Sequence, residues 1–212
     1  MFIGYFSLAN TVTLLGLSSS IMAVFCASQG LYPLALIMFM FAGLCDMFDG
    51  RIARGTSGRI RREKIYGIQL DSLADLVSFG VVPALIVHKM GYNEVIDLIL
   101  YLIFIVCGAT RLAYFNTQAL SDSPDLNMKT FTGLPIPFSC AALPVLVLFT
   151  TFVEPNITVW LFRAFFLLTS FAFILRIKIK KFSMNFLMAI GGFDVLCLIL
   201  LSFFADNIKL PV

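Results

Sequence analysis

Two stretches decide the fold: residues 46–54, Asp-Met-Phe-Asp-Gly-Arg-Ile-Ala-Arg, and residues 67–75, Gly-Ile-Gln-Leu-Asp-Ser-Leu-Ala-Asp. The first ends an apolar run without charges over 34–45, and the second opens another over 76–87. A helix crosses the bilayer core with about 20 mostly apolar residues. The two runs therefore predict a transmembrane hairpin that carries four carboxylates at one membrane boundary.

The composition extends this interpretation to the whole chain. Of 212 residues, 60% are hydrophobic, 13% are charged and 23 are Phe, whereas soluble domains average about 45–50% apolar and about 25% charged residues. A water-soluble domain is excluded, and no nucleic-acid partner is expected. We predict an all-α, polytopic transmembrane helical bundle that forms one domain over residues 1–212. Seven spans are expected, at about 9–29, 31–51, 69–89, 94–116, 135–153, 157–176 and 185–205.

Basic residues predict the orientation of the bundle. If seven spans alternate, most Lys and Arg residues fall on one side, which the positive-inside rule makes cytoplasmic. The N-terminus and the carboxylates then face the cytoplasm, and the basic loops 59–64 and 176–181 are expected to attract anionic membrane lipids. The residues on this side are Arg51, Arg54, Arg59, Arg61, Arg62, Lys64, Arg111, Lys129, Arg176, Lys178, Lys180 and Lys181.

The spacing of the acidic residues predicts a cation site. Asp46 and Asp49 are three residues apart, and Asp71 and Asp75 are four apart, so each pair shares one helix face. Facing helices would bring four carboxylates together, and they would repel one another unless cations bound between them. Oxygen ligands of this kind suit Mg²⁺ or Mn²⁺. Two such ions about 3.5–4 Å apart are the usual arrangement for displacement at phosphorus.

The combined pattern, D-x2-D-G-x2-A-R followed by G-x3-D-x3-D, resembles the signature of the CDP-alcohol phosphatidyltransferase family. The resemblance implies a six-helix membrane core, here with one further span, and a homodimer that binds two divalent ions and a CDP-linked donor. It implies that Asp46, Asp49, Asp71 and Asp75 hold the metal ions and that Asp75 is the general base. It assigns the CDP and diphosphate site to Asn10, Thr13, Asp46, Gly50, Ala53, Arg54, Gly67 and Asp71.

Further stretches are similar to the phosphatidylserine synthase (CDP-diacylglycerol–serine O-phosphatidyltransferase) branch of that family. They are Asp-Ser-Leu-Ala-Asp-Leu-Val-Ser-Phe-Gly-Val-Val-Pro-Ala at 71–84, Arg-Leu-Ala-Tyr-Phe-Asn at 111–116 and Thr-Gly-Leu-Pro-Ile-Pro at 132–137. This similarity implies transfer of the phosphatidyl group of CDP-diacylglycerol to L-serine. Because serine carries a carboxylate, we expect a cation in its pocket: Arg111, accompanied by Asn116 and Ser78.

The sequence departs from the family pattern at three places. Residues 55–66 form a longer connection than family members commonly have, Ala9 replaces a usual Pro, and Tyr114 stands where Arg is common. None of these changes an Asp, so they bear on the donor and acceptor contacts rather than on the metal ligands.

Two other functions remain open at this point. The acceptor could be another alcohol, such as glycerol 3-phosphate or inositol phosphate, although such acceptors need more Arg and Lys around their phosphate. A divalent-cation transporter could also use an Asp cluster, but transport sites usually lie near the bilayer midplane. Arg163 and Asp194 lie inside expected spans, where we expect a structural role and where the two could pair with each other.

Overall fold

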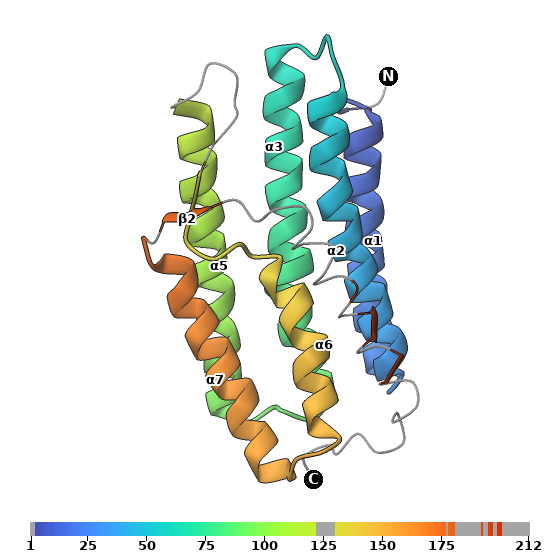
Figure 1. The fold of residues 1–212 in the computed structure, drawn as a ribbon, viewed down its shortest axis with the longest axis vertical. Helices are drawn as coiled ribbons and strands as arrows, with labels where there is room; N and C mark the ends of the chain where they lie inside the picture. Colours follow the sequence, from blue (N-terminus) through green and yellow to red (C-terminus); the bar gives the residue numbers. More distant parts are fainter. Residues whose placement is uncertain are drawn as a thin grey trace.

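The chain folds into a bundle of helices that lie side by side (Figure 1). The computed structural model describes residues 3–121, 130–176 and 178–180, with five scattered positions between 192 and 200. In chain order its elements are α1 (Leu8–Ser28), α2 (Tyr32–Gly55), α3 (Arg61–Asp75), the π-helix η1 (Leu76–Val81), α4 (Val82–Lys89), α5 (Val95–Ser121), β1 (Thr130–Thr132), α6 (Phe138–Thr150), α7 (Pro155–Ile174) and β2 (Lys178–Lys180).

Five helices among the described residues are long and apolar enough to cross a membrane: Leu8–Ser28, Tyr32–Gly55, Arg61–Lys89, Val95–Leu120 and Pro155–Ile174. The third is a continuous rod in which η1 joins α3 to α4. The rod starts well before the predicted boundary at residue 69, because α3 extends the apolar span by polar turns that begin at Arg61. The expected polytopic helical bundle is confirmed.

The predicted span count is confirmed only in part. In place of the span expected at 135–153 there is the 13-residue helix α6, which begins after Pro137 and is about 20 Å long, less than the bilayer core of about 30 Å. The span expected at 185–205 lies largely outside the described residues.

Close packing of α1 against α2 positions the site. A Cβ atom on Gly16 would lie 2.8 Å from the Cβ atom of Cys45, so only glycine allows the two helices to approach this closely. Small side chains at helix contacts are typical of membrane bundles, in which packing rather than the hydrophobic effect holds helices together. The approach brings Thr13, one turn from Gly16, against Asp49 on α2.

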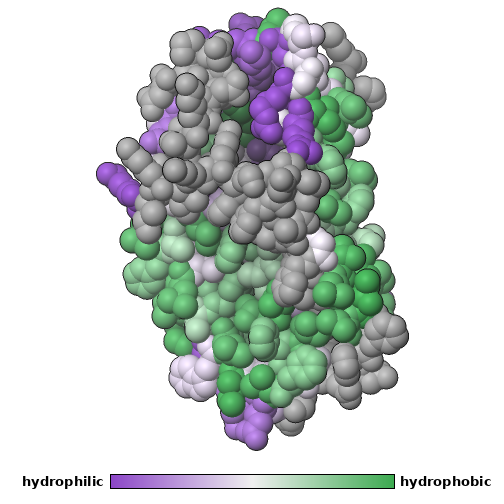
Figure 2. All heavy atoms as spheres, viewed as in Figure 1, coloured by the Kyte–Doolittle hydropathy of each residue, from purple (hydrophilic) through white to green (hydrophobic). Residues whose placement is uncertain are grey.

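Aromatic side chains fill the lower core, and apolar side chains cover the outside. Phe39, Phe79, Phe104 and Phe166 are fully buried, and the rings of Phe104 and Phe166 meet edge to face at 5.1 Å. Exposed Leu, Ile and Phe side chains are spread over the helices. Figure 2 shows them as a broad apolar belt below a hydrophilic end of the molecule, which is the surface expected of an integral membrane protein.

A two-stranded antiparallel ribbon was not predicted by the sequence analysis. Strand β1 pairs with β2 in the register Thr130↔Lys180, and the ribbon joins the approach to α6 with the end of α7. Gly133 follows β1 with a φ of +77°, and a Cβ atom there would lie 2.8 Å from the carbonyl oxygen of Phe173. Glycine is therefore required where the chain turns over the end of α7.

Candidate active site

Three of the four predicted metal ligands converge between α2 and α3. Asp46, Asp49 and Asp71 each offer a carboxylate oxygen, and these oxygens all lie within 4.8 Å of one another. Asp49 is only 4% exposed. The prediction that the two halves of the hairpin would bring their acidic faces together therefore agrees with the geometry of these three residues.

Asp75 lies in the same cavity, one turn below Asp71 on the continuous rod. It lines this cavity together with Asp46 and Asp71, and ionised carboxylates gathered in one cavity repel one another unless a proton or a cation lies between them. The cavity of about 10 Å³ admits roughly one water-sized particle. Its walls come from α1, α2, α3 and η1: Thr13, Gly16, Leu17, Ala42, Asp46, Asp49, Asp71, Ala74, Asp75, Ser78 and Phe79.

The donor set fits a hard divalent cation. Carboxylate oxygens are the ligands that Mg²⁺ and Mn²⁺ prefer, whereas Zn²⁺ and Cu²⁺ favour nitrogen and sulfur. Among the described residues, no Lys or Arg forms an ion pair with any of these four aspartates; the ion pairs found there join Arg163 to Glu94 and Asp97. The part of the chain that the structure describes therefore supplies no ion-pair partner to these carboxylates.

The N-terminal part of α1 supports the aspartates from one side. The Thr13 hydroxyl donates to Asp49 Oδ2 at 2.5 Å, which fixes the orientation of that carboxylate. Asn10 is 5% exposed and donates from Nδ2 to the carbonyl oxygen of Tyr5 at 2.7 Å. Its Oδ1 atom faces α3, 3.5 Å from the point where Gly67 would carry a Cβ atom.

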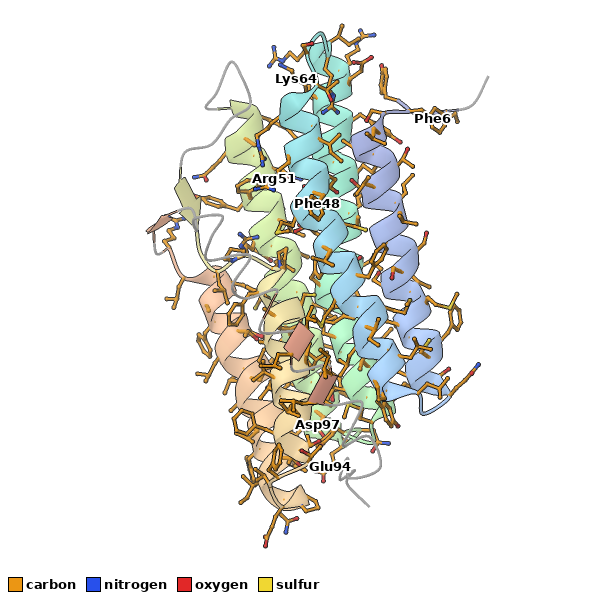
Figure 3. The ribbon with its side chains drawn as sticks, turned by 45° about the vertical axis from the view of Figure 1, so that its right-hand side comes forward. Phe6, Phe48, Arg51, Lys64, Glu94 and Asp97 are labelled. Carbon is orange, nitrogen blue, oxygen red and sulfur yellow. The ribbon has the colours of Figure 1, made fainter. Side chains whose placement is uncertain are left out.

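The two signature glycines lie further along the hairpin, toward the connection between α2 and α3. Gly50 follows Asp49, and Gly67 precedes Asp71 by one turn. The Arg54 guanidinium lies over Gly50, 3.3 Å from the position of a Cβ atom there. Ala53 is half-buried, one turn beyond Asp49 on the same face. In Figure 3, Phe48 and Arg51 mark this level of α2, below Lys64 at the tip.

The family model for CDP-alcohol phosphatidyltransferases matches residues 6–175, which include the whole of this hairpin. The chain belongs to the CDP-alcohol phosphatidyltransferase family. The family resemblance predicted from the sequence is confirmed.

Three relatives of this chain have names that refer to serine. The chain is 32% identical over 178 residues to the CDP-diacylglycerol–serine O-phosphatidyltransferase of Helicobacter pylori, covering 82% of this chain and 71% of that protein. It is 43% identical over 107 residues to the protein of the same name in Saccharomyces cerevisiae, covering 49% of this chain and only 37% of the yeast protein. The archaetidylserine synthase of Methanothermobacter thermautotrophicus is 31% identical over 140 residues, 66% of this chain and 57% of that protein.

The residues predicted to bind the acceptor do not share one cavity of this phosphatidyltransferase. Ser78 lies in the aspartate cavity and shares a hydrogen bond with Ser20 at 2.8 Å. Asn116 accepts a hydrogen bond from Ser72, the residue after Asp71, at 2.9 Å. Ser78 and Asn116 are thus tied to α1 and α3, at the edges of the aspartate site.

Arg111 lines a second cavity of about 150 Å³. Arg111 is 8% exposed, and its Nε atom has no hydrogen-bond partner among the described residues. The cavity therefore offers a buried cation with an N–H group that has no partner in the described part of the chain. The other lining residues are Thr110, Tyr114, Phe173, Ile174, Leu175 and Arg176.

The sequence analysis missed the position of two arginines. It assigned Arg59 and Arg176 to basic loops that attract lipid. In the structure Arg176 lines the second cavity and lies over the ring of Tyr114, at 5.7 Å, while Arg59 lies against Gly67. A signal for Arg176 was present in the sequence: Tyr114 stands where related proteins commonly have Arg, so that a second arginine could supply the charge from elsewhere.

Proposed function

We propose that this protein transfers the phosphatidyl group of CDP-diacylglycerol to L-serine, giving phosphatidylserine and CMP. The observation that carries the proposal is the convergence of Asp46, Asp49 and Asp71, within the region that matches the family model. The names of the relatives from bacteria, yeast and archaea, which all refer to serine, support this acceptor.

The proposed reaction is an in-line displacement. The serine hydroxyl oxygen forms a bond to the β-phosphorus, the bond from that phosphorus to the bridging oxygen breaks, and CMP leaves with the electron pair. Asp75 takes the proton from the hydroxyl. Mg²⁺ or Mn²⁺ ions held by Asp46, Asp49, Asp71 and Asp75 would neutralise the diphosphate and improve CMP as a leaving group. Positioning and charge supply most of the rate enhancement in such phosphoryl-type transfers.

The second cavity is the proposed acceptor site. Arg111 is buried, and its Nε–H group has no hydrogen-bond partner among the described residues. A serine carboxylate bound there would satisfy the guanidinium, because a fork of N–H groups matches a planar carboxylate. Asn116 and Ser78 would contact the rest of the acceptor. Arg176 adds a second cation at the open side of the cavity.

The proposal includes the orientation of the enzyme in the membrane and its oligomeric state. The polar residues 51–64 lie at one end of the bundle, and the positive-inside rule favours a cytoplasmic N-terminus and a cytoplasm-facing site. We also propose that residues 1–212 act as one catalytic domain and that the enzyme is a homodimer, as the resemblance implies.

The alternative within the family is another acceptor. A phosphorylated alcohol would need several cations on its phosphate, and the second cavity offers Arg111 and Arg176. Two cations are few for a phosphate group, but because they are present, glycerol 3-phosphate and inositol phosphate serve as the comparison substrates.

The test measures CMP release by the purified protein with CDP-diacylglycerol and Mn²⁺ or Mg²⁺, with each acceptor in turn. We expect release to depend on serine and to fall about 10²- to 10⁴-fold in Asp75→Asn, the range for loss of a general base. Glu94→Gln removes a charge at the far end of the bundle and is the matched control. Release that depends only on a phosphorylated alcohol would overturn serine, and the absence of release with every acceptor would overturn the transferase.

A further inference from the structure

Both signature glycines are covered by an arginine, but only one of these arginines belongs to the signature. Arg54 lies over Gly50, one turn along the same helix. Over Gly67 lies Arg59, whose Nη2 atom is 2.9 Å from the position that a Cβ atom on Gly67 would occupy. Arg59 comes from the connection between α2 and α3.

Arg59 differs from the other basic residues of this connection. Arg61, Arg62 and Lys64 are exposed, whereas Arg59 is half-buried. Its side chain turns back along α3, where Nη2 donates a long hydrogen bond of 3.4 Å to the carbonyl oxygen of Glu63. Its Nε atom is buried and has no partner among the described residues. A buried N–H group without a partner is costly, and a ligand that accepts from it would remove that cost.

The position of Arg59 determines which part of the donor can reach it. The aspartate cavity has room for about one water-sized particle, so the nucleotide must lie outside it, toward the tip of the hairpin. Gly67 is one helical turn from Asp71 in that direction, and Asn10 faces the same point from α1. A ligand that lies over Gly50 and Gly67 would therefore have Arg54 on one side and Arg59 on the other.

We propose that Arg59 is a donor-binding residue that contacts the cytidine-linked phosphate of CDP-diacylglycerol, and that Gly67 provides the space in which its guanidinium lies. The inference rests on the proposed function, because it requires a cytidine nucleotide as ligand. Guanidinium groups bind phosphate through paired, charge-assisted hydrogen bonds, and the Nε–H group of Arg59 has no partner among the described residues.

The experiment measures equilibrium binding of radiolabelled CMP, in the presence of Mg²⁺, to wild-type protein and to variants that elute as the wild type does from a sizing column. Arg59→Ala should bind CMP about 10- to 100-fold more weakly, the loss expected for a hydrogen bond to a charged group. Arg62→Ala removes the same charge from an exposed position of the same connection and should bind like wild type. Arg59→Lys should fall between the two.

Gly67 gives a second, independent test. In Gly67→Ala the new methyl group would meet Arg59 Nη2 at 2.9 Å, and the flexible guanidinium would have to move away. The double variant Arg59→Ala/Gly67→Ala should then bind CMP no more weakly than Arg59→Ala alone. Losses that add would mean that Gly67 touches the nucleotide directly, and the space-providing role would be wrong.

The outcomes separate the two proposals. Wild-type protein that fails to bind CMP would overturn the transferase and Arg59 together. Wild-type binding that Arg59→Ala changes by less than about twofold would overturn Arg59 alone. An equal loss in Arg62→Ala would show that the overall charge of the connection acts, and would also overturn a specific contact of Arg59.

Discussion

Acidic residues gather at two places in this bundle, and the two groups differ in their ion-pair partners. Near one end, Asp97 at the start of α5 and Glu94 just before it meet Arg163 of α7. Arg163 donates from Nε to Asp97 at 2.6 Å and from Nη2 to Glu94 at 2.7 Å. Figure 3 labels Glu94 and Asp97 at the end of the molecule opposite Lys64. In the other group Asp46, Asp49 and Asp71 converge, and no Lys or Arg of the described part pairs with them.

This difference in pairing predicts a structural role for the group around Arg163 and a functional role for the group without such a partner. A carboxylate that has its own arginine inside the protein is already neutralised, and its pair ties α5 to α7. Carboxylates that converge without such a partner are held together against their mutual repulsion, so their charge is available for an external cation. Placing carboxylates inside a membrane protein costs free energy in both groups. In the first group Arg163 offsets this cost, whereas in the second group a ligand would have to do so.

The largest expected effect is the loss of one unpaired carboxylate. In Asp71→Asn the proposed cation site would lose a ligand oxygen, and CMP release should fall by at least about 10³-fold, because a metal ion in such a site supplies several kcal/mol of transition-state stabilisation. Binding of Mn²⁺ should weaken in parallel, which a metal titration followed by electron paramagnetic resonance would detect.

The stability of Asp71→Asn sharpens the comparison. Because the substitution removes repulsion among like charges, the melting temperature of the metal-free protein should stay the same or rise, as measured by thermal scanning in detergent. A marked drop in melting temperature together with retained Mn²⁺ binding would contradict the assignment and would make Asp71 a structural residue.

The second prediction concerns the paired group, in which a substitution should lower stability and leave activity unchanged. Asp97→Asn would leave Arg163 without its most buried partner, since the Asp97 side chain is 5% exposed. The loss should be about 1.5–3 kcal/mol of the free energy of unfolding, the value of a hydrogen bond to a charged group. Activity per folded molecule should remain at the wild-type level, because no part of this group touches the aspartate cavity.

The measurement for Asp97→Asn combines thermal scanning with CMP release at a temperature at which the variant is folded. Release that falls while the melting temperature is unchanged would show that the far group takes part in catalysis, and the distinction between paired and unpaired carboxylates would fail.

The sequence predicted those parts of the structure that depend on neighbours in the chain. The period of the helix determines which face Asp46, Asp49 and Asp71 share, and one short connection makes their two helices adjacent. The carboxylate site therefore followed from the residues of a single hairpin. Helix periodicity did not assign Thr13 and Asn10 to the site, because α1 could have packed elsewhere. Only the family resemblance placed these two residues there.

Contacts between distant helices were not predicted correctly. Asp194, a possible partner of Arg163, lies outside the described residues. The pairing of Arg163 with Asp97, 66 positions earlier in the chain, was not foreseen. Hydropathy locates spans without telling which spans are neighbours in the bundle. The contact of Arg59 with Gly67 was missed for a related reason, since the path of a long connection is determined by tertiary contacts rather than by a repeating pattern.

The smallest expected effect lies within the paired group itself. Glu94 binds the same guanidinium as Asp97, but its side chain is 72% exposed, against 5% for Asp97. Water and salt screen an exposed pair, so Glu94→Gln should cost less than about 1 kcal/mol of the free energy of unfolding, and raising the salt concentration should reduce even this difference. Thermal scanning of Glu94→Gln beside Asp97→Asn, at low and high salt, measures both. A loss in Glu94→Gln as large as that in Asp97→Asn would mean that burial does not set the strength of these pairs. The contrast between the two acidic groups would then rest on the presence of Arg163 alone.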